Sequence, residues 1–345
     1  MYHYDSAGRL ASPGATDPGV DERAFQIGTF TDNTRSSMVG GVEQWQDWDL
    51  DGANNWTTNF DDDSTGTART HSALNEIVSV GTDPITHDAN GNMLDDGTRK
   101  LAWDAFGRLR EVRRTADNFL VARYHYDADN RRMTRMVSNG GIEADASLNG
   151  TTHFYYSGWR VMEERWRTGS TTEALLRQYI WGNYLDEVWT IDDRSGGITV
   201  ANLNDATGGE RHFALANTLY SVHGLADEEG NLVEAYEYDA YGRHTVRRPG
   251  GSATEVAFDA TDDVVAGGAS AHGNPFGYTG QRFDRETGLM YYKNRYYSPE
   301  LGRFASRDPL GAWFDPVNHG NAMAYVGNKT LSFMDSLGLC SSTPR

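Results

Sequence analysis

A six-residue pattern that recurs along the chain constrains its fold more than any other feature. The copy at residues 238–243 reads Tyr-Asp-Ala-Tyr-Gly-Arg. Clear copies occur at residues 4–9, 103–108, 126–131 and 238–243, and drifted copies at residues 50–55, 71–76 and 87–92. The fifth position of every one of these copies is Gly or Asn. Because these two residues adopt positive φ most readily, the pattern predicts a left-handed backbone position in a tight turn.

Each copy has the chemistry of a β-hairpin tip. An aromatic residue ends the incoming strand, and Asp starts the turn, where its side chain can accept backbone N–H groups two residues on. Gly or Asn then takes the left-handed position of a bulged hairpin loop. Residues 120–126 and 232–238, which precede two of the turns, alternate large and polar side chains. This alternation predicts strands with one buried face and one solvated face.

The spacing of the copies predicts a stacked array. From the copy at Asp51 to the copy at Asp127, equivalent positions advance by 21, 16, 16 and 23 residues. A single hairpin is marginally stable in water, so each repeat needs its neighbours to bury its apolar face. Gly is abundant at 38, and no stretch shows a sustained helical period. We therefore predict an all-β fold, an array of antiparallel β-hairpins with few or no helices.

Composition and charge argue against several classes of partner and location. A net charge of −18 with scattered basic residues disfavours nucleic acid as a partner. Cys340 is the single cysteine, so no disulfide forms within the chain. The first residues begin inside a repeat and show neither a signal peptide nor a membrane-spanning stretch. If the protein leaves the cell, we expect it to use other signals or a dedicated machine.

Metal and cofactor sites are not predicted. Residues 47–52 have the alternating Asp pattern and the Gly that open a calcium loop, but the twelfth position is Thr58 instead of a bidentate Glu. A drifted hairpin turn is the better interpretation of this segment. The ten histidines show no metal-ligand spacing. The aromatic stripes could stack on sugars, although an antiparallel wall needs the same stripes for packing.

The block at residues 274–339 differs from the repeats. It is compact and aromatic-rich, and it contains a dense series of short motifs. They are Asn-Pro-Phe-Gly-Tyr-Thr-Gly-Gln-Arg-Phe-Asp at 274–284, Gly-Arg-Phe at 302–304, Asp-Pro-Leu-Gly at 308–311 and Asp-Ser-Leu-Gly-Leu at 335–339. With these motifs after YD-type repeats, the chain resembles the RHS/YD-repeat proteins, which carry an RHS repeat-associated core. Relatives in that family include bacterial polymorphic toxins, wall-associated proteins and the C subunits of Tc toxins.

The resemblance implies an architecture. In that family the repeats form a spiralling β shell, and the core turns inward to seal it, so we expect a partial YD-repeat shell here. We divide the chain into a hairpin array at residues 1–135, a continuing shell with polar loops at 136–273, the core at 274–339 and a short tail at 340–345.

The resemblance also implies a catalytic site. Some members cut themselves just after the second Asp motif with an aspartyl-type autoprotease, and the matching residues are Asp308, Asp335 and Arg303. Two close carboxyls cannot both ionise, so one would stay protonated as an acid while the other activates water. The expected scissile bond joins Leu339 to Cys340. The alternative is that Asp308 and Asp335 only start turns in an inactive core.

Three departures from the family pattern bear on this choice. Ser336 and Thr330 stand where the family has proline, and residues 312–317 lengthen the loop between the two Asp residues. Proline fixes φ, so its loss loosens the geometry that would present the bond.

The resemblance favours a structural encapsulation module of a secreted or cell-surface toxin-type protein. The implied partner is a toxin effector domain or an additional shell-forming chain. A different class of function, a cell-surface adhesin for carbohydrate or a neighbouring cell, remains open beside it. In that case the core would be vestigial.

Overall fold

The computed structural model describes residues 25–26, 45–61, 66–169, 171–194, 209–248, 263–264 and 269–343. The repeat copy at 4–9, most of the polar stretch at 247–273 and the last two residues of the tail lie outside these ranges. Strand pairing within them is antiparallel throughout, and helical structure is confined to three-residue 3-10 turns. These turns are η1 (Ala146–Leu148), η4 (Tyr278–Gly280), η5 (Pro316–Asn318) and η6 (Val326–Asn328). The all-β prediction is confirmed.

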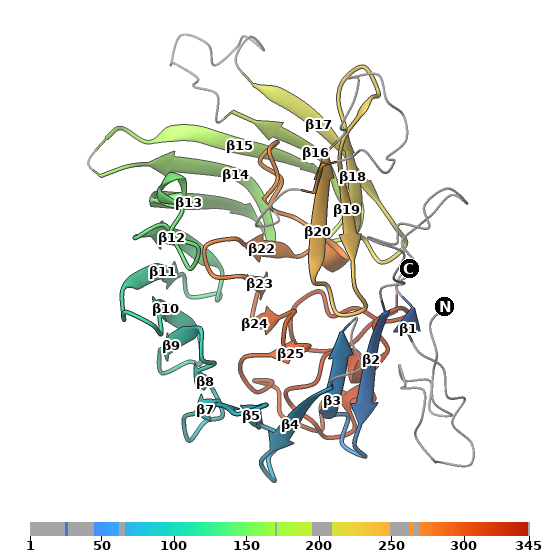
Figure 1. The fold of residues 1–345 in the computed structure, drawn as a ribbon. Coiled ribbons are helices and arrows are strands. Elements are labelled where there is room, and N and C mark those ends of the chain that lie inside the picture. The colour runs from blue at the N-terminus through green and yellow to red at the C-terminus, as the bar shows by residue number, and fades with distance from the viewer. Residues whose placement is uncertain are drawn as a thin grey trace.

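A 15-stranded sheet forms the main wall, with its strands side by side in sequence order. Figure 1 shows this sheet as a curve that rises from β7 to β15 and returns downward through β20. Its strands are β7 (Thr86–His87), β8 (Met93–Asp95), β9 (Arg99–Trp103), β10 (Leu109–Arg114), β11 (Leu120–Tyr126), β12 (Arg132–Val137), β13 (Gly150–Ser157), β14 (Arg160–Arg167), β15 (Ala174–Trp181), β16 (Val188–Asp193), β17 (Glu210–Ala216), β18 (Val222–Ala226), β19 (Leu232–Tyr238), β20 (His244–Arg248) and β21 (Asp263–Val264).

Two smaller sheets complete the described fold. The six-stranded sheet precedes the wall and contains β1 (Phe25–Gln26), β2 (Trp45–Leu50), β3 (Trp56–Asp61), β4 (Thr67–His71), β5 (Ile77–Val80) and β6 (Asp83–Pro84). The four-stranded sheet belongs to the core block and contains β22 (Arg282–Asp284), β23 (Leu289–Tyr292), β24 (Arg295–Ser298) and β25 (Arg303–Phe304). In Figure 1 this last sheet lies inside the curve of the wall.

The repeat turns have the predicted chemistry. In the turn at residues 126–131, Asp127 Oδ1 accepts the N–H groups of Asp129 and Arg131, each at 2.9 Å. Arg131 also donates from Nε to Asp127 Oδ2 at 2.7 Å, so the sixth position closes the turn through its side chain. The fifth position has positive φ in the described copies, at Asn54, Asn75, Gly91, Gly107, Asn130 and Gly242. The segment at 47–52 leads into such a turn between β2 and β3.

Two further turns repeat this geometry without the sequence pattern. Asp227 and Asn217 each accept two backbone N–H groups in the same way. In the second of these turns the left-handed position is Tyr220, with φ 63, so Gly and Asn are not the only residues found there. The Tyr220 ring stacks on Tyr184 with centroids 4.4 Å apart. We infer that this stacking offsets the cost of a positive φ in a bulky residue.

Buried ion pairs join the core block to the wall. Arg132 of β12 binds Asp284 of β22, and Glu164 of β14 binds Arg282, with all four side chains at most 4% exposed. Burial alone would raise the pKa of Glu164, but the charges of Arg282 and Arg177 lower it to about 2. Each buried carboxylate is therefore paired with an arginine from another element, and Glu164 is held charged by its partners.

The described residues contain no helix with the length and hydropathy needed to cross a membrane.

Candidate functional site

The structure brings Asp308 and Asp335 to one arginine. Arg295, at the start of β24, places Nη2 3.3 Å from Asp308 Oδ2 and 3.0 Å from Asp335 Oδ2. All three residues are buried. Asp308 N–H donates to the carbonyl of Ala322 at 3.0 Å, which fixes the backbone beside the site. Two carboxyls that are 27 residues apart in sequence, 335 minus 308, thus share one cation.

Arg295 is held in place from several directions. Its guanidinium lies 3.5 Å from the centroid of the Phe304 ring. Nε donates to the carbonyl of Gly338 at 2.6 Å, and Nη1 donates to the carbonyl of Ala322 at 3.1 Å. The position of the charge between the two carboxyls is therefore set by the packing of the core and not by a flexible side chain.

Arg303, the arginine expected at this site, lies elsewhere. Its Nη1 donates to the carbonyl of Asn75 and its Nη2 to Asn55 Oδ1, each at 2.8 Å. Burial lowers the pKa of Arg303 to about 10. These contacts tie β25 to two turns of the six-stranded sheet. The arginine of the Gly-Arg-Phe motif thus contacts the repeat turns, and Arg295 takes the position that we expected for it.

The pKa values of both carboxyls are raised. Burial raises the pKa of both Asp308 and Asp335, against the opposing charge of Arg295. The charge of Asp308 raises the pKa of Asp335 further. Raised pKa values in neighbouring carboxyls favour a state in which one is protonated and the other is charged.

Asp335 also touches the predicted scissile bond. Its Oδ1 accepts the N–H of Leu339 at 2.9 Å and the N–H of Cys340 at 3.2 Å. The Cys340 nitrogen is the leaving atom if the bond after Leu339 is hydrolysed. Gly338, with φ +67, makes the turn that brings the chain back, and a Cβ there would lie 2.6 Å from the carbonyl oxygen of Tyr292.

A third carboxylate, Asp315, holds the chain beyond Cys340. Its Oδ2 accepts the N–H of Ser341 at 2.8 Å and the Ser341 hydroxyl at 2.6 Å. Ser342 pairs with Met334 through backbone bonds of 2.9 and 2.7 Å in an antiparallel bridge. Asp315 belongs to the loop at residues 312–317, which the sequence presented only as an insertion. Its one local signal is the Asp-Pro pair that begins η5.

The residues that replace the family prolines have different surroundings. Ser336 Oγ hydrogen-bonds Tyr184 Oη at 2.8 Å, a link from the core to the wall that proline cannot make. Thr330 is fully buried, and its hydroxyl has no hydrogen-bond partner among the described residues.

One group of possible metal ligands was missed in the sequence. Glu210 and His212 lie on β17, and His272 lies in the segment that leads into the core. The two parts are far apart in the chain, so no spacing pattern connects them.

Comparison with known proteins relates the chain to YD shells and to toxins. Residues 34–144 match the Teneurin YD-shell family. The chain is 27% identical to the tRNA nuclease WapA of Bacillus subtilis, over 77% of this chain and 9% of WapA. It is 26% identical to the toxin protein Tse5 of Pseudomonas aeruginosa, over 98% of this chain and 23% of Tse5. The toxin subunit YenC1 of Yersinia entomophaga is 25% identical over 93% of this chain and 30% of YenC1.

A solved structure has the same fold. The crystal structure of TcdB2-TccC3 without its hypervariable C-terminal region superposes with a TM-score of 0.65 at 20% identity, over 98% of this chain and 15% of that chain. The chain thus spans less than a third of the length of each of these proteins.

Proposed function

We propose that this chain, which matches a YD-shell family over residues 34–144 and resembles RHS/YD-repeat toxins, forms part of the wall of a toxin-type capsule. Its core block lies against the inner side of that wall and cuts the chain after Leu339. The encapsulated partner is a toxin effector domain. Since the chain spans only a fraction of its relatives, additional shell-forming polypeptide completes the enclosure. The protein acts outside the producing cell or at its surface.

The contact between Asp335 and the Cys340 nitrogen carries the self-cleavage proposal. In the uncut chain the Cys340 N–H donates to Asp335 Oδ1. Once water has added to the Leu339 carbonyl carbon and the nitrogen has become basic, protonated Asp335 gives its proton to that nitrogen as the bond breaks. Asp308 Oδ2 is buried without a hydrogen bond among the described residues, so it can accept one from a water molecule. Asp308 takes a proton from the water, and the water oxygen adds to the Leu339 carbonyl carbon. The products are a carboxylate at Leu339 and an amino terminus at Cys340.

Intact mass spectrometry of the purified chain tests this reaction. We expect a mass that lacks residues 340–345, and a full-length mass for Asp308→Asn and for Asp335→Asn. Asp117→Asn, in an exposed wall turn, serves as the matched control and should be cut like the wild type. Circular dichroism shows whether each variant folds. A full-length mass for the folded wild type after prolonged incubation would refute self-cleavage.

The contacts beyond Cys340 support retention of the product. The bridge between Ser342 and Met334 and the bonds from Ser341 to Asp315 do not depend on the cut bond. A small folded reporter fused after residue 345 should therefore co-elute with the shell in gel filtration, although denaturing electrophoresis separates two pieces. Elution of the cut reporter as a free protein would count against encapsulation and leave the cleavage result intact.

Carbohydrate binding is the second candidate, and exposed aromatic side chains on the wall support it. Trp189 is 51% exposed and Tyr155 is 46% exposed. Such rings can stack on sugar faces. A glycan array with the wild type and with Trp189→Ala tests this role. We expect the wild type to bind a glycan and the variant to lose that binding.

A further inference from the structure

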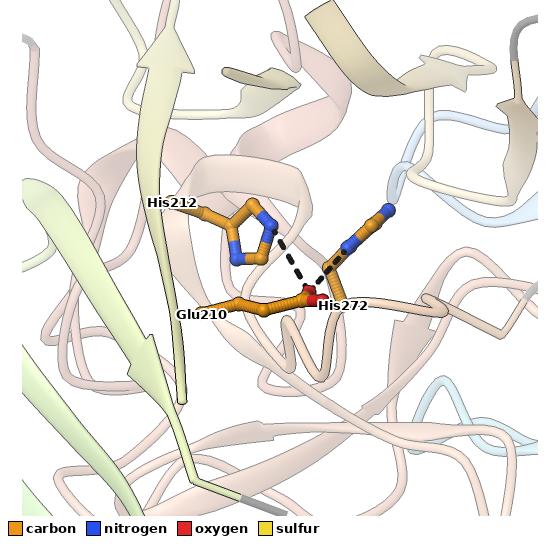
Figure 2. A group of neighbouring side chains, drawn as sticks. All are labelled: Glu210, His212 and His272. Atoms are coloured by element: carbon orange, nitrogen blue, oxygen red, sulfur yellow. Dashed lines mark hydrogen bonds and ion pairs between the residues drawn. The ribbon is translucent and has the colours of Figure 1, made fainter. Parts of the chain in front are cut away.

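We propose that Glu210, His212 and His272 bind a zinc ion that fastens the segment entering the core to the wall. Figure 2 shows the three side chains converging, with both imidazole rings directed at the carboxylate of Glu210. This site is separate from the carboxyl pair at Arg295, and it does not depend on self-cleavage.

The distances among the three side chains suit a tetrahedral metal ion. Glu210 Oε2 lies 3.2 Å from His272 Nδ1 and 3.6 Å from His212 Nε2. The three ligand atoms all lie within 4.8 Å of one another. Ligands at zinc-bond lengths in a tetrahedron are about 3.3 Å apart, so small side-chain adjustments would bring all three into contact with one ion. Two histidines with one carboxylate are a common ligand set for zinc.

The backbone positions these ligands before any metal arrives. Glu210 and His212 are two residues apart on β17, so their side chains lie on the same face of the strand. The strand is paired with β16, where Asp193 lies opposite Glu210 and Ile191 opposite His212. Two ligands of the site therefore share a fixed register.

The third ligand is placed by a tight turn. Ser270 Oγ accepts the N–H groups of His272 and Asn274, each at 3.1 Å. The N–H of Ala271 donates to Glu234 Oε1, on β19, at 2.9 Å. His272 is therefore presented to β17 by contacts that do not involve the other two ligands.

The His212 ring is buried where it faces the other two ligands. Its side chain is 3% exposed, and its Nδ1 is buried without a hydrogen-bond partner among the described residues. An imidazole nitrogen is a common zinc ligand, and His212 Nε2 is the nitrogen that faces Glu210.

Solvent can reach the site, which a metal needs in order to enter. The Glu210 side chain is 70% exposed, whereas the His272 side chain is 23% exposed. Three protein ligands leave one tetrahedral position for water. A zinc ion here would connect a wall strand with the residues just before the core, so metal binding and docking of the core would stabilise each other.

Isothermal titration of the full chain, prepared without a histidine tag, with Zn²⁺ tests the proposal. We expect one site per chain, and its loss in His272→Ala and in Glu210→Gln. The matched control is His153→Ala. His153 also pairs with a glutamate, Glu173, but among the described residues it belongs to no group of three possible metal ligands. Wild-type binding should persist in that control.

Two further readouts separate the proposed site from general surface binding. The melting temperature of the wild type should rise by about 3 °C when free Zn²⁺ exceeds its Kd about 100-fold, and that of His272→Ala should not. Co²⁺ substitution should give the visible absorption of a tetrahedral site in the wild type and not in His272→Ala. The proposal is overturned if the wild type takes up no Zn²⁺, or if both ligand variants bind it as the wild type does. Glu210→Gln keeps the test valid should His272→Ala fail to fold.

Discussion

Two copies of the same repeat turn, at residues 103–108 and 238–243, have matching local bonds and opposite environments. Asp104 and Asp239 each accept two backbone N–H groups at 2.9–3.0 Å and a bond from the arginine of their own turn at 2.7 Å. The aromatic residue at the fourth position is 78% exposed in Phe106 and 0% exposed in Tyr241. The turn is thus built locally, and packing against segments distant in sequence decides whether it is covered.

The coverage of the second turn comes from side chains distant in sequence. The Tyr241 ring packs against Trp48 and Trp56, with centroids 4.9 and 4.3 Å away. Tyr241 Oη donates to Asn328 Oδ1 at 3.0 Å, and Tyr297 Oη donates to the carbonyl of Tyr241 at 2.8 Å. The turn at residues 238–243 of the wall therefore contacts both the six-stranded sheet and the core.

Truncating the fourth-position ring should give the largest difference between the two turns. We expect Tyr241→Ala to lower the free energy of unfolding by about 3–5 kcal/mol, because it leaves a cavity among buried rings and removes the hydrogen bond to Asn328 Oδ1. Phe106→Ala should change it by less than about 0.5 kcal/mol, because its ring faces solvent. Denaturant unfolding measures both. Equal costs would show that the core does not hold this turn in solution.

A substitution at the left-handed glycine separates backbone strain from coverage. Gly107 and Gly242 have φ of 72 and 88, so Ala at either position should cost about 1–2 kcal/mol in strain. A Cβ at Gly107 would lie 3.8 Å from Asn92 Oδ1, whereas one at Gly242 would lie 2.6 Å from the Tyr278 ring. We therefore expect Gly242→Ala to cost about 1–3 kcal/mol more than Gly107→Ala in the same unfolding experiment. If both variants lose the same free energy of unfolding, the Tyr278 ring moves aside at little cost and the packing around Gly242 is loose.

The same contrast explains what could be predicted from the sequence. The turn at 103–108 is closed by bonds that span at most four residues, so its residue types reveal its shape. The all-β array and the distinct core block followed from such local signals. The turn at 216–221 was not predicted because its left-handed position is Tyr220 instead of Gly or Asn. The Tyr220 ring stacks on Tyr184.

The candidate sites depend on contacts that local patterns do not encode. Asp308 and Asp335 were identified through a family resemblance, and their catalytic role remains a prediction. The arginine between them was not identified, because Arg303 instead reaches Asn55 across 248 residues and Arg295 reaches Asp335 across 40. Asp315 and the ligands around His272 are likewise brought into place by the way the core folds back on the wall.

The smallest expected difference between the two turns is a difference of sign in their response to pH. Asp104 has a pKa held below its usual value, since hydrogen bonds from its own turn and from Arg108 outweigh the effect of burial. Burial raises the pKa of Asp239 above its usual value, despite the charge of Arg243. A lowered pKa in the folded state adds stability that is lost as pH falls below the usual value of 3.8. A raised pKa does the reverse, so stability is lost as pH rises above 3.8 toward the raised value.

The comparison is therefore made with Asp104→Asn and Asp239→Asn, each measured against the wild type by thermal unfolding from pH 6 to pH 3. As the pH falls, the advantage of the wild type over Asp104→Asn should shrink, and its advantage over Asp239→Asn should grow, each by less than about 1 kcal/mol. Asparagine removes the titration but keeps an acceptor for the backbone N–H groups. Trends of the same sign at both positions would mean that the core does not desolvate Asp239, and that the two turns differ less in solution than their rings suggest.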